Sequence, residues 1–283
     1  MLISGDKVGI GLRPLHYYQI LEERPKIDWL EVHPENFMVK GGYLLDILSS
    51  IRTMYPISFH GIGLSLGSSM GLNRQYLKRI KTLIHHFDPV LISDHLSWSN
   101  AGPQYFPDLF PIPYNQESLV IFENNIDAAQ TYLQRTLLIE NPSSYLEYNT
   151  STYPEAEFLT ELIKRTGAKI LLDINNIYVS CMNHSWNPIQ YIKTIPYESV
   201  AEIHIAGHSI IAQNEHNNLL LDTHDNFVCQ DVWDLYSYAI KHIGLVPTLL
   251  EWDANIPNLE VLLNEAKKSV YYLKHTTNTA RFY

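Results

Sequence analysis

The residues of this chain that could do chemistry are His, Asp and Glu side chains at the ends of short apolar runs. Glu140 follows the run 137–139 and stands directly before Asn-Pro, a pair that ends a strand and opens a loop. Comparable runs end at Glu31 and His33, His60, Asp94 and His95, Asp173, His204, and Glu251. A carboxylate at the end of a buried strand is costly to desolvate unless it is paired or binds a metal ion. The repeated nitrogen and oxygen donors, without thiolates, therefore predict a site for divalent Fe, Mn or Zn.

These runs are expected to be strands, because segments with helical spacing of apolar residues separate them. Leu77, Ile80, Ile84 and Phe87 form one such helical face, and Asn73 stands where a helix N-cap is expected. Strands that alternate with helices build right-handed βαβ units, and eight of these units close into a (β/α)8 TIM barrel of the α/β class. The carboxyl ends of barrel strands share the face on which active sites lie, so the metal site is predicted there.

Composition and charge are those of a soluble globular protein. The chain has 46% hydrophobic and 18% charged residues, and its 283 residues suffice for a single TIM-barrel domain over 1–283. Segment 274–283 lacks periodicity and is predicted to be a short C-terminal extension. The formal charge of −10 argues against nucleic-acid binding, and no apolar run reaches membrane-spanning length or forms a signal peptide. We therefore expect a cytoplasmic protein with neither nucleic acid nor membrane as partner.

Several segments between the strands carry signals of their own. The long, proline-rich segment 97–113 is predicted to be a loop that forms a lid or a binding wall. Thr152 and Glu155 have the spacing of a capping box at the start of a helix. The segment 219–225 is predicted to be an inserted loop or short strand.

Each candidate ligand also has a structural explanation when it is taken alone. His60 or His95 could be a hydrogen-bonded structural histidine, and Glu140 could be a buried acid paired with Arg13. Asp173 could cap a turn, and Asn176 is an ordinary turn residue. For Glu31, His33 and Glu35 we expect that the side chains line the pocket without binding metal. Taken together these explanations are weaker than one metal site, because nearly every strand would need its own.

Contiguous strings of residues then resemble a known family over nearly the whole chain. They include EVHPEN at 31–36, HGIGLSLGS at 60–68, SDHLSW at 93–98, IENPS at 139–143, DINNIYVS at 173–180, EIHIAGH at 202–208, DTHD at 222–225 and EWD at 251–253. These strings resemble the multinuclear non-haem iron-dependent oxidative enzymes of the methanobactin-biosynthesis type, which modify peptides.

The resemblance implies a cofactor of two or three iron ions, Fe(II) or Fe(III), with O2 as co-substrate. It implies three groups of metal ligands: His60, His95 and a bridging Glu140; Asp173, His204 and Glu251; and Asn176, Asp222 and His224 for a more labile ion. It also implies that Asp94 and Asp253 act in the catalytic site by orienting ligands. His208 is a further candidate without an assigned role.

By the same resemblance, the chain is expected to be an oxidase or oxygenase of peptide natural-product biosynthesis. Its substrate would be a cysteine residue of a ribosomally synthesised precursor peptide. A separate partner protein that recognises the peptide is expected, because no second domain is apparent in the chain. The competing interpretation is a metal-dependent hydrolase or isomerase on a barrel like that of endonuclease IV or xylose isomerase. A metal-dependent interaction protein without catalysis is the third.

Overall fold

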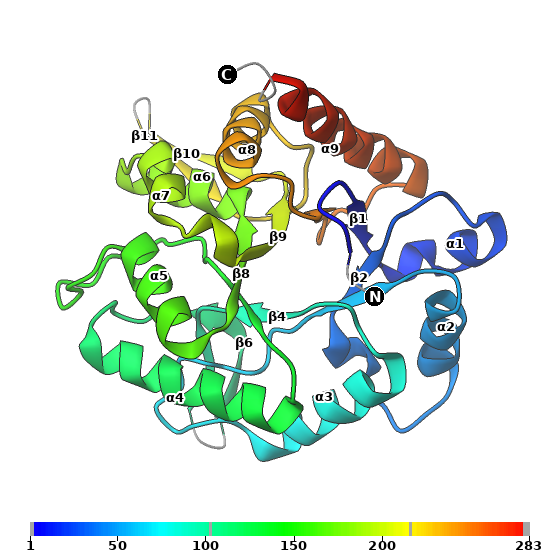
Figure 1. Ribbon diagram of the computed structural model, residues 1–283, viewed down its shortest axis with the longest axis horizontal. Helices are drawn as coiled ribbons and strands as arrows, with labels where there is room; N and C mark the ends of the chain where they lie inside the picture. Colours follow the sequence, from blue (N-terminus) through cyan, green and yellow to red (C-terminus); the bar gives the residue numbers. More distant parts are fainter. Residues whose placement is uncertain (1–2, 102–103, 215–216, 280–283) are drawn as a thin grey trace.

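Eight of the apolar runs form a closed parallel barrel in a computed structural model of the protein (Figure 1). The structure describes residues 3–101, 104–214 and 217–279. The barrel strands are β1 Val8–Gly11, β2 Leu30–Val32, β3 Ile57–His60, β4 Ile92–His95, β7 Leu138–Glu140, β8 Lys169–Asp173, β9 Val200–Ile205 and β12 Thr248–Leu250. Their hydrogen-bonded order is β1-β12-β9-β8-β7-β4-β3-β2, which confirms the predicted TIM barrel.

Strand register brings the polar strand ends to one level of the barrel. His95 on β4 is the register partner of Glu140 on β7, and Asp173 on β8 is the partner of His204 on β9. The residues before these ends are nearly all buried and mostly apolar, because each strand is covered by the barrel interior on one side and by helices on the other. The candidate ligands are therefore neighbours in space although tens of residues separate them in the chain.

Helices surround the barrel in Figure 1. They are α1 Tyr17–Glu23, α2 Tyr43–Arg52, α3 Arg74–Phe87, α4 Gln116–Leu133, α5 Glu155–Thr166, α6 Ile174–His184, α7 Pro188–Thr194, α8 Gln230–Ile243 and α9 Leu259–Thr279, with short 3-10 turns at Pro14–His16, Pro34–Phe37 and Tyr197–Ser199. Asn73 caps α3 as predicted, since its side chain accepts hydrogen bonds from the backbone N–H groups of Gln75 and Tyr76. Among the described residues no helix combines the length and the apolar character needed to cross a bilayer.

Two local expectations differ from the structure. The capping box is wrong, because Pro154 is the N-cap residue of α5 and no side chain caps this helix. Glu155 instead turns inward and accepts hydrogen bonds from Tyr114, Ser144 and Tyr191. In addition, α9 continues to Thr279, so much of the segment expected to be an aperiodic extension is helical. Residues 280–283 of that segment lie outside the described residues.

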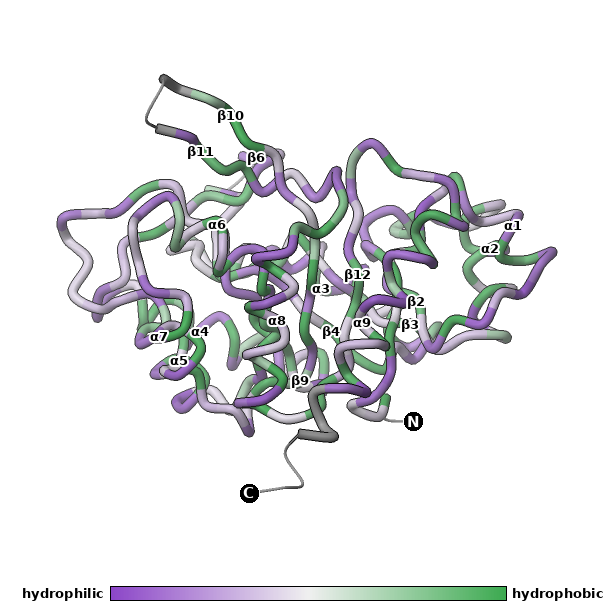
Figure 2. Tube along the Cα trace, turned by 90° about the horizontal axis from the view of Figure 1, so that it is seen from above, coloured by the Kyte–Doolittle hydropathy of each residue, from purple (hydrophilic) through white to green (hydrophobic). Residues whose placement is uncertain are grey.

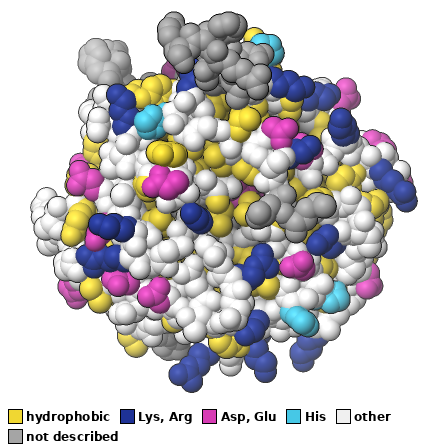
Figure 3. All heavy atoms as spheres, in the orientation of Figure 1, with side chains coloured by type: hydrophobic (Ala, Val, Ile, Leu, Met, Phe, Trp, Pro, Cys, Tyr) yellow, Lys and Arg dark blue, Asp and Glu magenta, His cyan; other side chains and the backbone are white. Residues whose placement is uncertain are grey.

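Two hairpins stand on the face of the barrel where the strands end. The segment expected to be an irregular loop contains β5 (Trp98–Ala101) and β6 (Gln104–Phe110), and a second hairpin joins β10 (Ser209–Asn214) to β11 (Asn217–Leu221). Figure 2 shows the β10–β11 hairpin projecting from the body on the side opposite the two chain termini. On the face seen in Figure 3, basic and acidic side chains are interspersed. The two hairpins are the main additions to the barrel on the face where its strands end.

Close packing in the barrel wall gives a first testable prediction. Gly9 on β1 lies against the indole ring of Trp29, which is fully buried, and a Cβ at position 9 would overlap that ring. We expect Gly9→Ala to destabilise the fold by about 1–3 kcal/mol, because a packed core has no room for an extra methyl group. Chemical denaturation would measure the loss. The double variant with Trp29→Leu should recover part of it, and a Gly9→Ala protein as stable as the parent would contradict this packing.

Candidate metal centre at the barrel mouth

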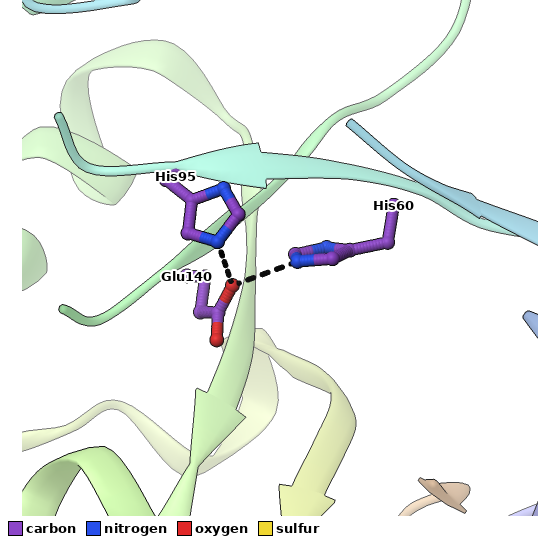
Figure 4. A group of neighbouring side chains, drawn as sticks. All are labelled: His60, His95 and Glu140. Carbon is purple, nitrogen blue, oxygen red and sulfur yellow. Dashed lines mark ion pairs between the residues drawn. The ribbon is translucent and has the colours of Figure 1, made fainter. Parts of the chain in front are cut away.

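Two histidines and one carboxylate form the first group of candidate ligands (Figure 4). His60 Nε2 lies 3.2 Å and His95 Nε2 lies 3.0 Å from the same oxygen, Oε2 of Glu140. The other ring nitrogens have separate partners, because His60 Nδ1 is 2.8 Å from Ser93 Oγ and His95 Nδ1 is 3.1 Å from the carbonyl oxygen of Gly61. A hydrogen bond at Nδ1 fixes the ring and leaves Nε2 free for a metal ion. The group therefore has the arrangement of a three-ligand site.

A second group shares Glu140 with the first. One donor atom from each of Glu140, Asp173, His204 and Glu251 lies within 4.8 Å of all the others. His204 Nδ1 is 3.0 Å from Glu251 Oε2. Two donors on one ion with bonds of about 2.1 Å lie roughly 3–4 Å apart, so these separations fit a shared ion. Glu140 thus belongs to both groups.

The third group predicted from the resemblance is only partly assembled. His224 Nε2 lies 2.6 Å from Asp222 Oδ1, and His224 Nδ1 lies 3.2 Å from Glu251 Oε2. The backbone of His224 has φ 43°, in the left-handed region that residues other than glycine rarely adopt. Asn176 instead contacts the first group, since its Nδ2 donates to Glu140 Oε1 at 3.3 Å while its Oδ1 accepts from Ser143.

Asp173 combines a structural role with a free oxygen. It ends β8 and caps α6, with Oδ1 accepting the backbone N–H of Asn176 at 2.7 Å. Asn141 holds the backbone of Asp173 through both its N–H and its carbonyl group. Oδ2 is buried and has no hydrogen-bond partner among the described residues. The capping explanation and the ligand explanation are therefore compatible, because each uses a different oxygen.

The protonation states of the cluster follow from burial and charge. Burial acts to raise the pKa of Glu140, but His95 and His60 outweigh it and lower this pKa to about 2. Burial acts to lower the pKa of His60, but the Glu140 carboxylate raises it to about 10. Burial, together with the nearby Glu140 carboxylate, raises the pKa of Asp173 well above its usual value. A buried oxygen without a hydrogen-bond partner among the described residues, such as Asp173 Oδ2, fits a divalent cation, which would neutralise the carboxylates around it.

A second prediction concerns proton release on metal loading. At pH 7 the metal-free protein should carry a proton on His60, since the pair with Glu140 keeps its pKa near 10. This pair stabilises the metal-free fold fully between about pH 4.5 and pH 6.5. The contribution is lost as the pH rises through about 10, where His60 loses its proton, or falls through about 2, where Glu140 gains one. Because metal must displace the proton, Mn²⁺ affinity should increase with pH across this window and Mn²⁺ binding should release protons.

Calorimetry in buffers of different ionisation enthalpy would count the protons released. His60→Gln should release fewer of them than the parent protein. Equal release by the two proteins would contradict the protonation assigned to His60.

The two aspartates expected to orient ligands lie in different surroundings. Asp94 is buried beneath the loop that follows β3, where its carboxylate accepts the backbone N–H groups of Leu64 at 3.0 Å and His95 at 2.8 Å. Asp253 lies at the cavity and forms an ion pair with Arg13, whose guanidinium is also 4.0 Å from Glu251 Oε1. The proposed pairing of Arg13 with Glu140 is therefore wrong, because Arg13 is paired on the opposite side of the cluster.

The remaining sequence candidates divide between the cavity wall and its supports. His33 lines the cavity, and its Nδ1 is 3.1 Å from the carbonyl oxygen of His60. Glu35 accepts a hydrogen bond from the hydroxyl of Tyr76 behind the first group. His208 Nδ1 lies 2.8 Å from Asn175 Oδ1, and Asn175 Nδ2 in turn donates to Asp222 at 2.7 Å. His208 thus reaches the candidate ligands only through Asn175.

A cavity of about 480 Å³ opens above the donors. Its floor contains His60, His95, Glu140, His224 and Glu251. Its apolar wall comes from the segments that follow β4 and β7 and includes Leu96, Phe110, Pro111, Pro142 and Leu146. The segment 97–113 therefore supplies one wall of the cavity, as expected of so long a connection. A polar floor beneath partly apolar walls is the usual lining of a small-ligand site.

Two carboxylates below the mouth have no role in the groups above. Glu31 on β2 and Glu202 on β9 are 2% and 0% exposed, and both face His204. Glu202 stands two residues before His204 on the same strand, so both side chains point into the barrel at successive levels. In the sequence, the position of the charged Glu202 between the apolar Ala201 and Ile203 could have marked it as a candidate site residue. Because Glu202 does not stand at the end of its strand, no role was assigned to it. Neither Glu31 nor Glu35 lines the cavity, contrary to expectation, whereas His33 does.

Comparison with known proteins identifies relatives along nearly the whole chain. A family model described as "RiPP precursor modification enzyme MbnB/TglH/ChrH" matches residues 7–274. The chain is 45% identical over 271 residues to a UPF0276 protein of Psychromonas ingrahamii, which covers 95% of this chain and 94% of that protein. It is 46% identical over 267 residues to a UPF0276 protein of Vibrio vulnificus, with 94% and 91% covered.

Solved structures share the barrel at low sequence identity. An L-ribulose 3-epimerase superposes with a TM-score of 0.64 at 12% identity, covering 97% of each chain. Endonuclease IV from Thermus thermophilus superposes with a TM-score of 0.53 at 11% identity, covering 96% of this chain and 99% of the other. At such identities the likeness concerns the fold alone.

Proposed function

The chain belongs to the MbnB/TglH/ChrH family of RiPP precursor modification enzymes, and we propose that it oxidises cysteine residues of a precursor peptide using non-haem iron and O2. RiPPs are ribosomally synthesised peptides that are modified after translation. The substrate would therefore be a genetically encoded peptide with at least one cysteine. The same proposal makes the chain an oxidoreductase of natural-product biosynthesis.

The observation that carries this proposal is the position of Glu140 between two groups of nitrogen and oxygen donors. His60 and His95 would hold one iron with Glu140, and Asp173, His204 and Glu251 would hold a second on its other side. A donor set of imidazoles and carboxylates without thiolate suits iron in its ferrous and ferric states. Asp222 and His224 would contribute to a third, more exposed ion, with Asn176 as its least supported ligand.

The protein's own residues would bind and orient the peptide side chain. When bound, iron would supply the one-electron chemistry through which the cysteine is oxidised and O2 is reduced. Leu96 and Phe110 would exclude water from the cysteine of the peptide when it occupies the cavity. Arg13 balances the charge of Asp253 and Glu251 at the rim of the cluster, and Asp94 holds the loop whose Gly61 carbonyl orients His95. Asp94 and Asp253 would thus act as positioning residues.

Anaerobic purification followed by metal analysis and oxygen-uptake measurements tests the proposal. The probe is the cysteine-containing peptide encoded beside the gene. We expect two or more iron equivalents per chain and oxygen uptake that depends on the peptide. Tightly bound zinc with phosphodiesterase activity would contradict the proposal and support a hydrolase. Iron without any peptide-dependent turnover, when the partner protein encoded nearby is also present, would contradict it too.

We further propose that a separate protein presents the peptide to this chain. The cavity can enclose a cysteine and its immediate neighbours, whereas a precursor peptide is much longer. A pull-down with the tagged precursor peptide would test this. Weak capture by the chain alone and strong capture after addition of the partner encoded nearby are expected, and tight binding by the chain alone would remove the need for a partner.

A further inference from the structure

Beneath the barrel mouth, the fold encloses a second set of donors that the proposed iron cluster does not use. One donor atom from each of Glu31, Glu202 and His204 lies within 4.8 Å of the other two. The three residues are 2%, 0% and 0% exposed. They come from β2 and β9, which β1 and β12 separate in the barrel wall, so the fold itself brings them together.

The two ring nitrogens of His204 serve different levels of the barrel. Nδ1 lies 3.0 Å from Glu251 Oε2, on the side of the mouth cluster. Nε2 lies 3.1 Å from Glu31 Oε1 and 3.7 Å from Glu202 Oε1, on the deeper side. These separations are those of donors on one divalent ion, which lie roughly 3–4 Å apart when the bonds are about 2.1 Å long.

Glu202 is the observation that points to a ligand. Both of its carboxylate oxygens are buried and neither has a hydrogen-bond partner among the described residues. Glu31, by contrast, is oriented by Ser58, whose hydroxyl donates to Oε2 at 2.8 Å and leaves Oε1 turned toward His204. Two buried carboxyl groups are neutralised either by protons or by a cation, and the single imidazole beside them supplies at most one positive charge.

We propose that Glu31, Glu202 and Nε2 of His204 bind a divalent cation of the Mn²⁺, Fe²⁺ or Zn²⁺ class below the mouth cluster. Binding replaces the Nε2 proton, which leaves to solvent, so that His204 joins the deep cation to the mouth cluster as an imidazolate. The deep cation neutralises the two carboxylates and binds the ring of His204 from the deeper side. Its role is structural, because the donors do not line the cavity.

Anomalous diffraction from crystals of the full chain grown with Mn²⁺ tests this inference without any variant. We expect one peak within bonding distance of Glu31, Glu202 and His204 Nε2, in addition to peaks at the mouth. Peaks at the mouth without a deep peak would overturn the deep site and leave the mouth cluster standing. A deep peak alone would do the reverse, and crystals without any peak would overturn both.

Variants then assign the deep peak to its ligands. Glu202→Gln should lose that peak and lower the Mn²⁺ stoichiometry in equilibrium dialysis by about one equivalent, while the mouth peaks remain. Glu198→Gln is the matched control, since Glu198 is exposed just before β9 and should bind Mn²⁺ like the parent protein. Unchanged stoichiometry in Glu202→Gln would overturn the assignment, whether or not this variant is less stable.

Discussion

Glu140→Ala should abolish activity while the barrel stays folded. The variant removes the one carboxylate that contacts both histidines of the first group and also belongs to the second group. Two cations would then face each other with less negative charge between them, so the iron content should fall. The loss of several kcal/mol of transition-state stabilisation corresponds to at least a ~10³-fold lower rate. Iron analysis, circular dichroism and peptide turnover would measure the three effects separately.

One further variant shows whether the charge or the size of the Glu140 side chain is needed to bind iron, and a second serves as a control. Glu140→Gln keeps the size of the side chain but removes its charge, and it should also lose iron. Glu147→Ala removes an exposed carboxylate from the loop after β7 and should behave like the parent protein. Full activity in Glu140→Ala would refute the bridging position assigned to this residue.

His224→Ala should have the second largest effect, on metal content more than on stability. The imidazole contacts Asp222 on one side and Glu251 on the other, so its removal should lower the iron content by about one equivalent. His224 also has φ 43°, a conformation that glycine adopts without strain. His224→Gly should therefore lose the same iron while it is at least as stable as His224→Ala.

His242→Ala provides the control for these variants, because His242 is exposed on α8. It should retain the iron content and the melting temperature of the parent protein. Should His224→Ala bind as much iron as the parent, His224 would leave the set of proposed ligands.

The barrel and the convergence of its strand ends could be predicted because both depend on local patterns. Apolar runs identify strands buried on both faces, and the parallel topology places every strand end on one side. His95 and Glu140 are neighbours for this reason, although tens of positions separate them. The sequence could not decide between capping and metal binding for Asp173. The helix that Asp173 caps begins with the very next residue, and only one of its two oxygens accepts the capping hydrogen bond.

Features that depend on packing between distant segments could not be predicted. Glu155 has the spacing of a capping box, but three hydroxyl groups from elsewhere in the fold draw it into the interior. Arg13 is paired with Asp253 because β1 and β12 are neighbours in the closed barrel, a relation that appears only when the first and last strands meet. Glu202 stands two residues before His204, deeper in the barrel, where it is fully buried. This burial depends on the closure of the barrel and not on the local sequence.

The mass of the precursor peptide after exposure to the iron-loaded protein and O2 tests the central claim most directly. We predict a mass change confined by fragmentation to a cysteine residue, and no change when that cysteine is replaced by serine or when Glu140→Ala replaces the parent protein. An unmodified peptide in the presence of iron, O2 and the partner protein would contradict the claim, as would the same modification by Glu140→Ala.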